Sequence, residues 1–403
     1  MEETPFIEEL SKEGFSRRGL LKRGAVAGVG MTALAGLAVE AAGARSSVEA
    51  ARATRSALDT VRWVSPRGTL EVMDDYNLLI PIVMGYYKTL NINAKLSPGD
   101  ASGNLPLIAV GQMDMGYASP GVFTASVDAG VPVFSIWEQY PAQVFDFVLS
   151  AKSKLTHPRQ LRGKTIAIHN IGWKSIVDPM LAEVGVNPKT VKYREFGGQW
   201  VQAVSLGLAD AGLAWEGLRA QLLGLGYFGS GTGELKFLIG TKWGSKGPSN
   251  SYQVRKDDLD DSQKMDVYTR FLAGSVMGFE FCRVNPRAAA QITYEQYPGL
   301  QKVISPQVAV DSLMQLASGY HTSRRLPPHL YGYHYPAAWT KYLNTVAKLG
   351  QTKKRLTLRD VLTNDLVKPA NAKADKARAR KDAAKYKLSA AFKKTTLPKG
   401  LPL

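Results

Sequence analysis

The chain has 403 residues, of which 45% are hydrophobic and 21% are charged, a composition typical of a globular protein with a sizeable core. Its single cysteine, Cys282, excludes an internal disulfide and a thiolate metal cluster, and its five histidines show no metal-ligand spacing. The formal net charge is +17, but eleven Lys and Arg against two Asp fall within 368–403, so the rest of the chain is only moderately basic. These basic residues lie in a terminal tail and not in an aromatic-interleaved stripe, since Tyr386 and Phe392 are the only aromatic residues there, so nucleic acid is a weak candidate.

Residues 1–44 have the pattern of an export signal. The run Ser16-Arg17-Arg18-Gly19-Leu20-Leu21-Lys22 matches the twin-arginine pattern S-R-R-x-F-L-K, with Leu20 in the phenylalanine place. An uncharged stretch and the small-x-small sequence Ala42-Gly43-Ala44 follow, which predicts cleavage before Arg45. The alternative is an uncleaved membrane anchor, although a spanning helix needs about 20 apolar residues and this stretch is shorter. We therefore expect export by the twin-arginine machinery to the periplasm.

Strands and helices alternate in the first half of the mature chain, which predicts βαβ units and mainly parallel sheets. A helix is expected to begin at Pro81, where the missing N–H costs nothing, and another at Pro120. The other predicted elements of this first block are strands at 61–65, 113–118, 133–137 and 145–150 and a helix at 105–110.

A second block repeats this order after residue 151. Its predicted elements are strands at 165–169, 191–194 and 212–215 and helices at 175–184, 200–206 and 216–223. The chain is then mainly helical, at 258–284, 286–297, 306–318 and 336–349, and these helices are expected to pack on the first block. The Lys- and Ala-rich residues 368–403 predict a solvated, disordered tail, with a cationic helix that touches anionic lipid or a partner as the alternative.

Several short runs, in order, resemble periplasmic solute-binding proteins of the sulfonate, nitrate and thiamine-precursor group. Each run alone is weak evidence for the family. The resemblance rests on the occurrence of all of them in the family's order over about residues 61–320. Asn91 replaces a usual glycine, and the tail has no counterpart. The matching runs are Gly85-Tyr86-Tyr87-Lys88, Gly111-Gln112-Met113-Asp114-Met115-Gly116, Leu161-Arg162-Gly163-Lys164, Gly185-Val186-Asn187-Pro188 and Gly207-Leu208-Ala209-Asp210-Ala211.

The resemblance implies a bilobal α/β periplasmic-binding-protein fold of type II that closes about a hinge. The first lobe is expected at 61–150 and 250–350, and the second at 151–249. It also implies a solute-binding component of an ABC-type importer, with a membrane permease as partner and without catalysis or cofactor.

Ligand-binding residues are expected where loops follow the carboxyl ends of the strands, because helix N-termini there present free N–H groups. Arg67 and Thr69 follow the first strand, and Ser119 precedes the helix at Pro120. Asn170 follows the first strand of the second block. Each has a structural alternative: Arg67 as a solvated cation and Ser119 as a helix cap.

Four tryptophans fall at or beyond predicted strand ends, where a ring can stack on a flat ligand or wall off a small one. Trp173, Trp200 and Trp215 are the candidates, whereas Trp137 is equally well explained as core packing. Glu216 can accept hydrogen bonds from a ligand amine or simply favour the start of its helix.

Two ligand classes follow from these residues, a small organic anion such as an alkanesulfonate and a flat aromatic or heterocyclic solute. An enzyme on the same fold is the main rival, because desulfinases use a cysteine nucleophile and the pyrimidine synthases of fungi use several cysteines with iron. Cys282 lies in a predicted helix away from the strand ends, which favours an inert buried thiol. A receptor domain for a signalling partner is the third class.

Overall fold

The computed structural model describes residues 58–70, 72–101, 103–224, 235–240, 242–243, 247–320 and 328–401. The chain divides into two units, Met1–Asp59 and Thr60–Leu403, and the second unit contains both β-sheets and their helices. The predicted twin-arginine segment lies outside the described residues. None of the described helices is both long and apolar enough to cross a membrane.

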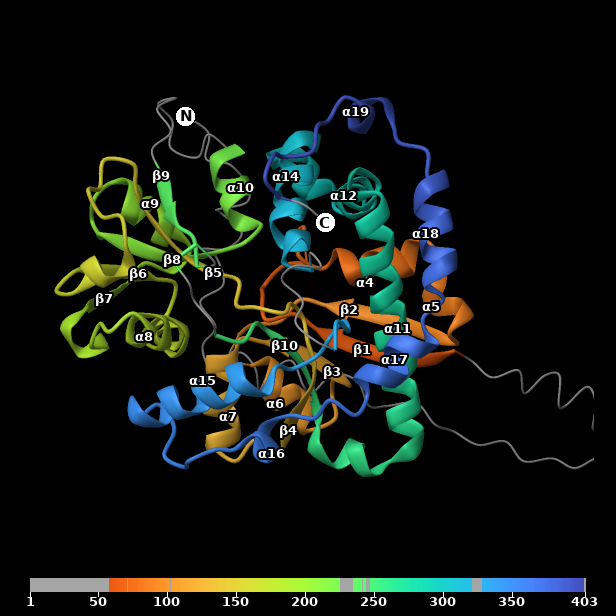
Figure 1. Cartoon of the computed structure of the whole chain (residues 1–403), viewed down its shortest axis with the longest axis horizontal. Coiled ribbons are helices and arrows are strands. Elements are labelled where there is room, and N and C mark those ends of the chain that lie inside the picture. The colour runs from red at the N-terminus through yellow and green to blue at the C-terminus, as the bar shows by residue number, and fades with distance from the viewer. Residues whose placement is uncertain are drawn as a thin grey trace, which may run out of the picture. The chain divides into compact units, whose positions relative to one another are not determined.

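The first of two sheets has the strand order β2-β1-β3-β10-β4 (Figure 1). β1 runs parallel to β3, with Trp63 opposite Met115, whereas β10 is antiparallel to both β3 and β4. Every residue of β3 and β4 is buried, as expected for strands covered on both faces. The bounds are β1 Asp59–Val64, β2 Ile92–Ser97, β3 Met115–Ala118, β4 Val133–Glu138 and β10 Ser251–Arg255.

The second sheet has the order β7-β6-β8-β5-β9. β6 is parallel to β7 and β8, whereas β5 is antiparallel to β8 and β9. Both sheets are therefore mixed, and not mainly parallel as the alternation of elements predicts. The bounds are β5 Phe145–Ser150, β6 Thr165–Ile168, β7 Lys192–Glu195, β8 Ala211–Trp215 and β9 Leu235–Leu238.

The assignment of Phe145–Ser150 to the first lobe is wrong. This strand is β5, which pairs with β8 and β9 of the second sheet, so the chain leaves the first sheet after β4 and not after residue 150. An apolar strand carries no local sign of the sheet that it joins, because its partners are distant in sequence. The chain returns to the first sheet between β9 and β10.

Most helices lie where the sequence predicts them, and several begin at proline. Ser119 caps α7, and Pro120 is its first residue, as expected. Pro81 is an exception, because it lies inside α4 and does not begin it.

The helices up to β9 are α4 Tyr76–Val83, α5 Tyr86–Thr89, α6 Asn104–Ala109, α7 Pro120–Asp128, α8 Lys174–Glu183, α9 Trp200–Ser205 and α10 Leu218–Gly224. Those after β10 are α11 Ser262–Val284, α12 Pro286–Glu295, α13 Pro298–Val303, α14 Pro306–Ala317 and α15 Pro336–Lys348. Short 3-10 turns occupy Pro158–Leu161 (η1), Ile171–Trp173 (η2), Pro188–Thr190 (η3), Gly197–Gln199 (η4), Lys256–Asp260 (η5) and Ser318–Tyr320 (η6).

The long helix α11 packs closely on α4 and α5 because two of its residues are glycines. A Cβ at Gly278 would lie 2.5 Å from the carbonyl oxygen of Asn77, and one at Gly274 would lie 2.3 Å from the ring of Tyr87. Glycine at these positions therefore allows an approach that any side chain would block. Cys282, near the end of α11, is buried, which confirms its prediction as a buried thiol.

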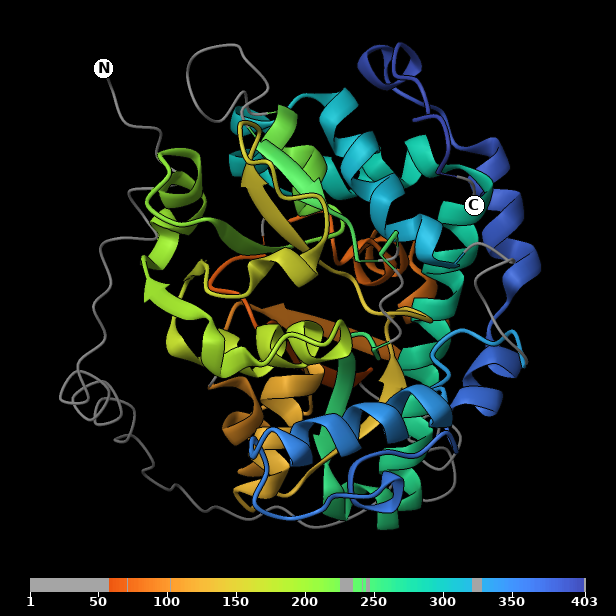
Figure 2. The same ribbon diagram turned by 60° about the vertical axis from the view of Figure 1, so that its left-hand side comes forward.

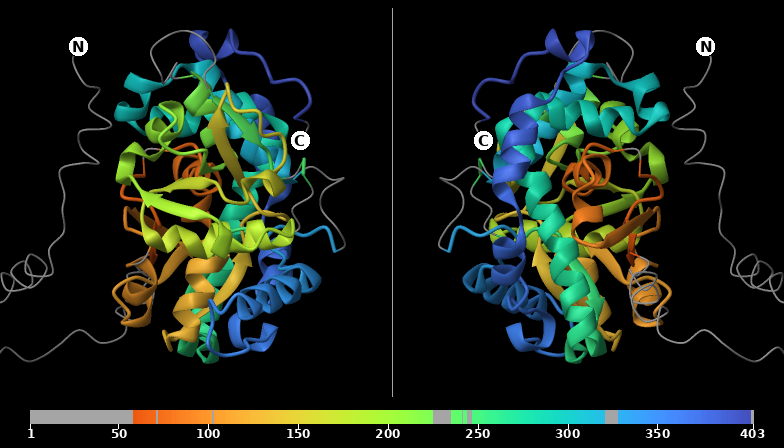
Figure 3. Two further views of the ribbon diagram at one scale, coloured as in Figure 1. Left: turned by 90° about the vertical axis from the view of Figure 1, so that its left-hand side faces the viewer. Right: turned by 90° about the vertical axis from the view of Figure 1, so that its right-hand side faces the viewer.

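The C-terminal residues are folded, so the prediction of a disordered tail is wrong. After α16 (Leu358–Val361) they form α17 (Val367–Lys373), α18 (Lys376–Lys385) and α19 (Ala390–Lys393). α17 and α18 lie along α11, and α19 packs on α12 and α14 (Figures 1 and 3). Their buried side chains include Val367, Ala370 and Asn371 of α17, Ala379 and Ala383 of α18, and Phe392 of α19.

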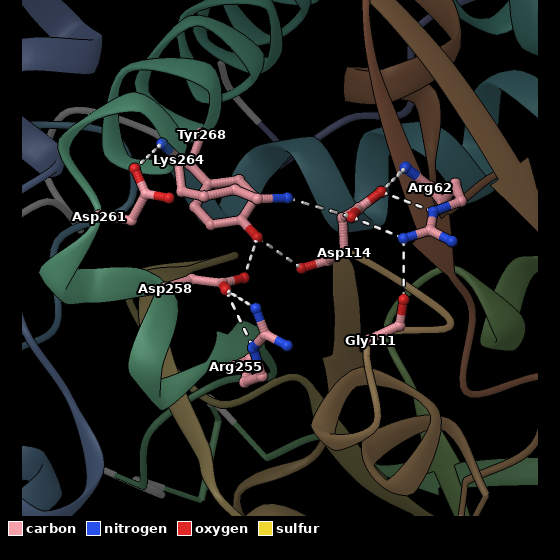
Figure 4. Close-up of polar contacts among 8 residues, drawn as sticks. All are labelled: Arg62, Gly111, Asp114, Arg255, Asp258, Asp261, Lys264 and Tyr268. Carbon is pink, nitrogen blue, oxygen red and sulfur yellow. Dashed lines mark hydrogen bonds and ion pairs between the residues drawn. The ribbon is translucent and has the colours of Figure 1, made fainter.

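A polar network joins the first sheet to α11 at the edge away from the carboxyl ends of β1 and β3 (Figure 4). The guanidinium of Arg62 donates to both carboxylate oxygens of Asp114, each at 2.9 Å. The hydroxyl of Tyr268 donates to Asp258 at 2.5 Å and lies 3.2 Å from the carbonyl oxygen of Asp114, and Asp258 also pairs with Arg255. These contacts fix the start of β3 to the helix that follows β10.

Candidate ligand-binding site

The loops after β1 and β3 of the first lobe meet the loops after β6 and β8 of the second, where the resemblance places a ligand. The side chain of Trp215 in the second lobe lies beside the carboxylate of Asp74 in the first and acts to lower its pKa, so the two lobes interact here. In a second contact between the lobes, a Cβ on Gly121 of α7 would lie 2.2 Å from the carbonyl oxygen of Ser175 of α8. The two lobes are thus in contact along this edge (Figure 2). We call the group Arg67, Asp74, Tyr117, Trp173 and Trp215 the interlobe site.

Arg67 is held by two carboxylates and an aromatic ring. Its guanidinium lies 2.5 Å from Asp75 and 3.5 Å from Asp74, and 5.8 Å from the ring centroid of Tyr117. Burial alone would lower the pKa of Arg67, but the charges of Asp75 and Asp74 outweigh it and raise that pKa. Arg67 is therefore not the solvated cation of the structural alternative, and an anionic ligand would have to compete with two carboxylates for it.

Asp74 is the carboxylate that faces the second lobe. It is 8% exposed, and burial raises its pKa to about 6 despite the attraction of Arg67, with the negative charge of Asp75 adding to the rise. A buried carboxylate beside an equally buried neighbour gains most from a ligand that brings positive charge or N–H donors.

Tyr117 and Asn250 form the first-lobe wall next to Arg67. The Asn250 side chain lies beside the Tyr117 hydroxyl and acts to lower its pKa, but burial outweighs this effect and raises that pKa. The Oδ1 atom of Asn250 is buried and, among the described residues, has no hydrogen-bond partner. That oxygen is a further acceptor at the site, and the sequence patterns did not identify it because Asn250 lies in the crossing between the lobes.

Three predicted tryptophans form one cluster in the second lobe. Ring centroids are 5.3 Å apart for Trp173 and Trp200, 6.2 Å for Trp173 and Trp215, and 6.3 Å for Trp200 and Trp215. Trp200 is 7% exposed and lies in the core of the lobe, whereas Trp173 and Trp215 are only partly buried. Trp173 and Trp215 therefore offer ring surface at the interlobe site, with Trp200 supporting them from behind.

Trp137 is a core residue. Its side chain is fully buried, and a Cβ at Gly332 would lie 2.1 Å from its ring.

Glu216 belongs to a second buried charge cluster, next to the interlobe site. Arg219 donates to Glu216 at 2.8 Å and to Asp146 at 2.6 Å, and Asp146 also accepts from the backbone N–H of Gly240 at 2.7 Å. Burial, together with the charge of Glu216, raises the pKa of Asp146 to about 7. The sequence patterns did not indicate Asp146 and Arg219, although an aspartate inside the apolar run 145–150 was a visible sign.

Three predicted polar residues have local structural contacts. The hydroxyl of Ser119 accepts from the backbone N–H of Val122 at 3.4 Å, which confirms the cap interpretation. The side chain of Asn170 accepts from the N–H of Gly172 at 3.0 Å and caps the turn η2. Thr69 follows Arg67 in the same loop and is partly exposed. Their place as ligand contacts stays a prediction.

A small cavity of about 40 Å³ lies between α7, α8 and α15. Its lining includes Ile176, Met180, Ala338 and Tyr342, and it contains none of the predicted site residues. Its volume suits one or two water molecules and not an organic solute. Among the described residues, no group of three His, Cys, Asp or Glu side chains is placed to hold a metal ion.

Solved structures with the same arrangement are periplasmic binding proteins of type II, and this chain has their fold. The alkanesulfonate-binding protein SsuA from Xanthomonas axonopodis pv. citri, bound to MOPS, aligns with a TM-score of 0.56 at 14% identity, over 75% of this chain and 98% of that one. The aliphatic sulphonate binding protein SsuA from Escherichia coli aligns with a TM-score of 0.53 at 12% identity, over 75% and 91%. A Candida albicans protein with the generic periplasmic binding protein fold aligns with a TM-score of 0.54 at 15% identity, over 76% and 97%.

The family model described as NMT1/THI5 like matches residues 77–289, just over half of the sequence. The chain belongs to the NMT1/THI5-like family. No curated protein matches it.

Proposed function

We propose that the chain is the solute-binding component of an ABC-type importer, exported by the twin-arginine machinery to the periplasm, where it delivers a captured ligand to a membrane permease. The family, the type II fold and the export pattern of residues 1–44 support this function. Two of the solved structures with this fold are of sulfonate-binding proteins, and a third is of the ligand-binding component of an import system from Staphylococcus aureus.

Of the two ligand classes open from the sequence, the flat heterocyclic or aromatic solute fits better, and we propose that it carries a basic group. The observation that carries this choice is the pairing of Arg67 with both Asp74 and Asp75 beside Trp215. A sulfonate would meet a cation that two carboxylates already neutralise. A protonated amine can instead pair with Asp74, while its ring stacks on Trp173 or Trp215.

An enzyme of the desulfinase type is the alternative, and it would need an accessible thiolate. Cys282 is 1% exposed, and burial raises the pKa of its thiol, so this residue does not favour that function. Recovery of each bound ligand unchanged, measured by mass spectrometry after long incubation, is the expected result. A new product would contradict the binding function itself.

Intrinsic tryptophan fluorescence and calorimetry with a panel of heterocyclic amines, pyrimidines, aromatic acids, alkanesulfonates and nitrate test the ligand class. We expect saturable binding of a basic ring compound, weakened at least about tenfold, or about 1.4 kcal/mol, in Trp173→Ala and Trp215→Ala. Phe237→Ala removes a half-buried ring from the edge strand β9 and is the matched control. Tight alkanesulfonate binding that both indole variants leave unchanged would overturn the proposed ligand and site.

The pH dependence of binding gives a second test of the same site. Because the pKa of Asp74 is about 6, its carboxylate becomes protonated as the pH falls through that value, and affinity for a cationic ligand should fall with it. Asp74→Asn should bind more weakly at neutral pH and lose this dependence. A pH profile that is the same in Asp74→Asn and the unaltered chain would assign the dependence to another group.

A further inference from the structure

The outer side of α17, α18 and α19 carries a row of lysines, called the basic ridge. Each of these lysines is exposed, and among the described residues none has a carboxylate within ion-pair distance. The ridge consists of Lys368, Lys381, Lys385, Lys387, Lys393, Lys394 and Lys399.

The helices present this ridge because their other face is occupied. In α18, Ala379 and Ala383 are buried in the packing with α11, and Lys381 and Lys385 each lie two residues further on, about 200° around the helix axis. Their side chains therefore point away from the protein. Figure 3 shows α18 on the outer side of α11, with no further layer over it.

Both arginines of the same segment are engaged within the protein. Arg380 pairs with Glu280 at 2.7 Å, and Arg378 lies 3.5 Å from Asp382 and 5.2 Å from the ring centroid of Tyr86. Arginine, the residue type whose guanidinium makes paired hydrogen bonds to a carboxylate or phosphate, is thus engaged within the fold. The exposed charges of the basic ridge are all lysines. Lysine is a compact, mobile point charge that suits a diffuse negative surface better than a shaped protein pocket.

We propose that the basic ridge docks the protein on an anionic phospholipid bilayer. Aromatic side chains of the segment do not extend the ridge, because Tyr386 packs on Phe281 and Phe392 is buried. The attachment is therefore electrostatic adsorption without insertion, and it is weakened by salt. It would hold the lobe pair close to the membrane independently of the ligand that the interlobe site takes.

Co-sedimentation of the full chain with vesicles tests this proposal. One set of vesicles contains equal parts of phosphatidylglycerol and phosphatidylcholine, and the other contains phosphatidylcholine alone. We expect preferential binding to the first set at low salt, lost at high salt, and at least about tenfold weaker partitioning for the triple variant K381E/K385E/K387E. The control K152E/K154E/K192E makes the same charge change at exposed lysines of the second lobe and should bind as the unaltered chain does.

Both variants keep residues 1–57, so any contribution of that segment is the same in all three proteins. Circular dichroism and thermal unfolding check that the variants are folded, as expected for exposed sites. Equal losses of vesicle binding in the two triple variants would assign the binding to net charge and would overturn the proposed role of the basic ridge. Binding of the unaltered chain that is the same on both vesicle sets would overturn it as well.

Discussion

Glu138, the last residue of strand β4, is a buried carboxylate that should make stability depend on pH. Glu138 is 2% exposed and accepts from the backbone N–H of Ser249 at 2.8 Å and from the indole of Trp339 at 3.1 Å. Burial nevertheless raises the pKa of Glu138 to about 8. Desolvation thus outweighs the hydrogen bonds, and the folded chain prefers the neutral acid.

Because that pKa is raised, the folded chain binds more protons at Glu138 than the unfolded chain between about pH 4.5 and 8, and stability should fall as the pH rises through this window. Glu138→Gln should flatten this fall in chemical denaturation measured across the window. It should also lower overall stability, by about 1–3 kcal/mol, since an amide cannot accept as well from both donors. Glu195→Gln, at an exposed position, is the control. An unchanged slope in Glu138→Gln would assign the dependence to other groups.

At the scale of elements, the network in Figure 4 ties strand β3 to helix α11. The hydrogen bonds from Arg62 to Asp114 overcome the effect of burial and lower the pKa of Asp114. Asp114→Asn should destabilise the fold by about 2 kcal/mol, a value limited by the 44% exposure of the Arg62 side chain.

The sign of the pH effect follows from the lowered pKa. The contribution of Asp114 is present above its ordinary pKa and is lost as the pH falls through the folded value, so the difference between Asp114→Asn and the unaltered chain should shrink in acid. Urea denaturation at neutral and acidic pH measures both quantities. A difference that grows in acid would contradict the assignment.

The C-terminal helices should contribute to stability and not merely extend the chain. Phe392 is 2% exposed and packs edge-on against Tyr294, with ring centroids 5.6 Å apart. Phe392→Ala should lower the free energy of unfolding by about 3 kcal/mol, as for other buried aromatic truncations. Leu397→Ala, at a site that is 48% exposed, should change it by less than about 0.5 kcal/mol. Equal effects of the two variants would mean that the tail does not pack.

Local sequence patterns were sufficient to predict most helices and strands. They were insufficient where contacts with residues distant in sequence decide the structure. The turns before Pro120 and Pro286 and the apolar strands of both sheets follow from capping and periodicity. The tail did not, because the buried face of α18 consists of Ala379 and Ala383, whose small area gives little hydrophobic signal but permits close packing on α11. The predicted strands also lack β2, β9 and β10, and β10 pairs with strands more than a hundred residues earlier, which no local pattern indicates.

For the candidate site, strand ends and tryptophans indicated several residues that the structure brings together, but not the charges that surround them. Arg67 was identified from its place after β1, yet its partner Asp75 lies in a loop that gave no sign of folding back. The polarity of a site depends on which charges face one another across loops, and this is not a local property of sequence.

At the scale of the whole molecule, the lobes are joined by helix α14 as well as by the interlobe site. The side chain of Gln315 accepts from the backbone N–H groups of Gly217 and Ala220, both at 3.1 Å, and so caps the start of α10 in the second lobe. Ser312 donates to the carbonyl oxygen of Gly217 at 2.8 Å. These bonds stabilise the arrangement in which the lobes touch.

Gln315→Ala would leave the two N–H groups at the start of α10 without this acceptor. It should destabilise the arrangement in which the lobes touch by about 1–2 kcal/mol. We expect a larger radius of gyration in solution scattering without ligand, and about tenfold weaker ligand binding. Gln301→Ala removes a glutamine that bonds only within its own region and should change neither. A radius equal to that of the unaltered chain would show that α14 does not control closure.

The position of β10 also has a consequence for the order in which the protein can be made. The first sheet lacks its strand between β3 and β4 until residues 251–255 have left the ribosome, because they follow the entire second lobe. A nascent chain that ends earlier exposes the edges of two buried strands, which favours association with other chains. The second lobe, whose strands are contiguous in sequence, can form first. Completion of the fold therefore falls late in synthesis, when most of the chain is present.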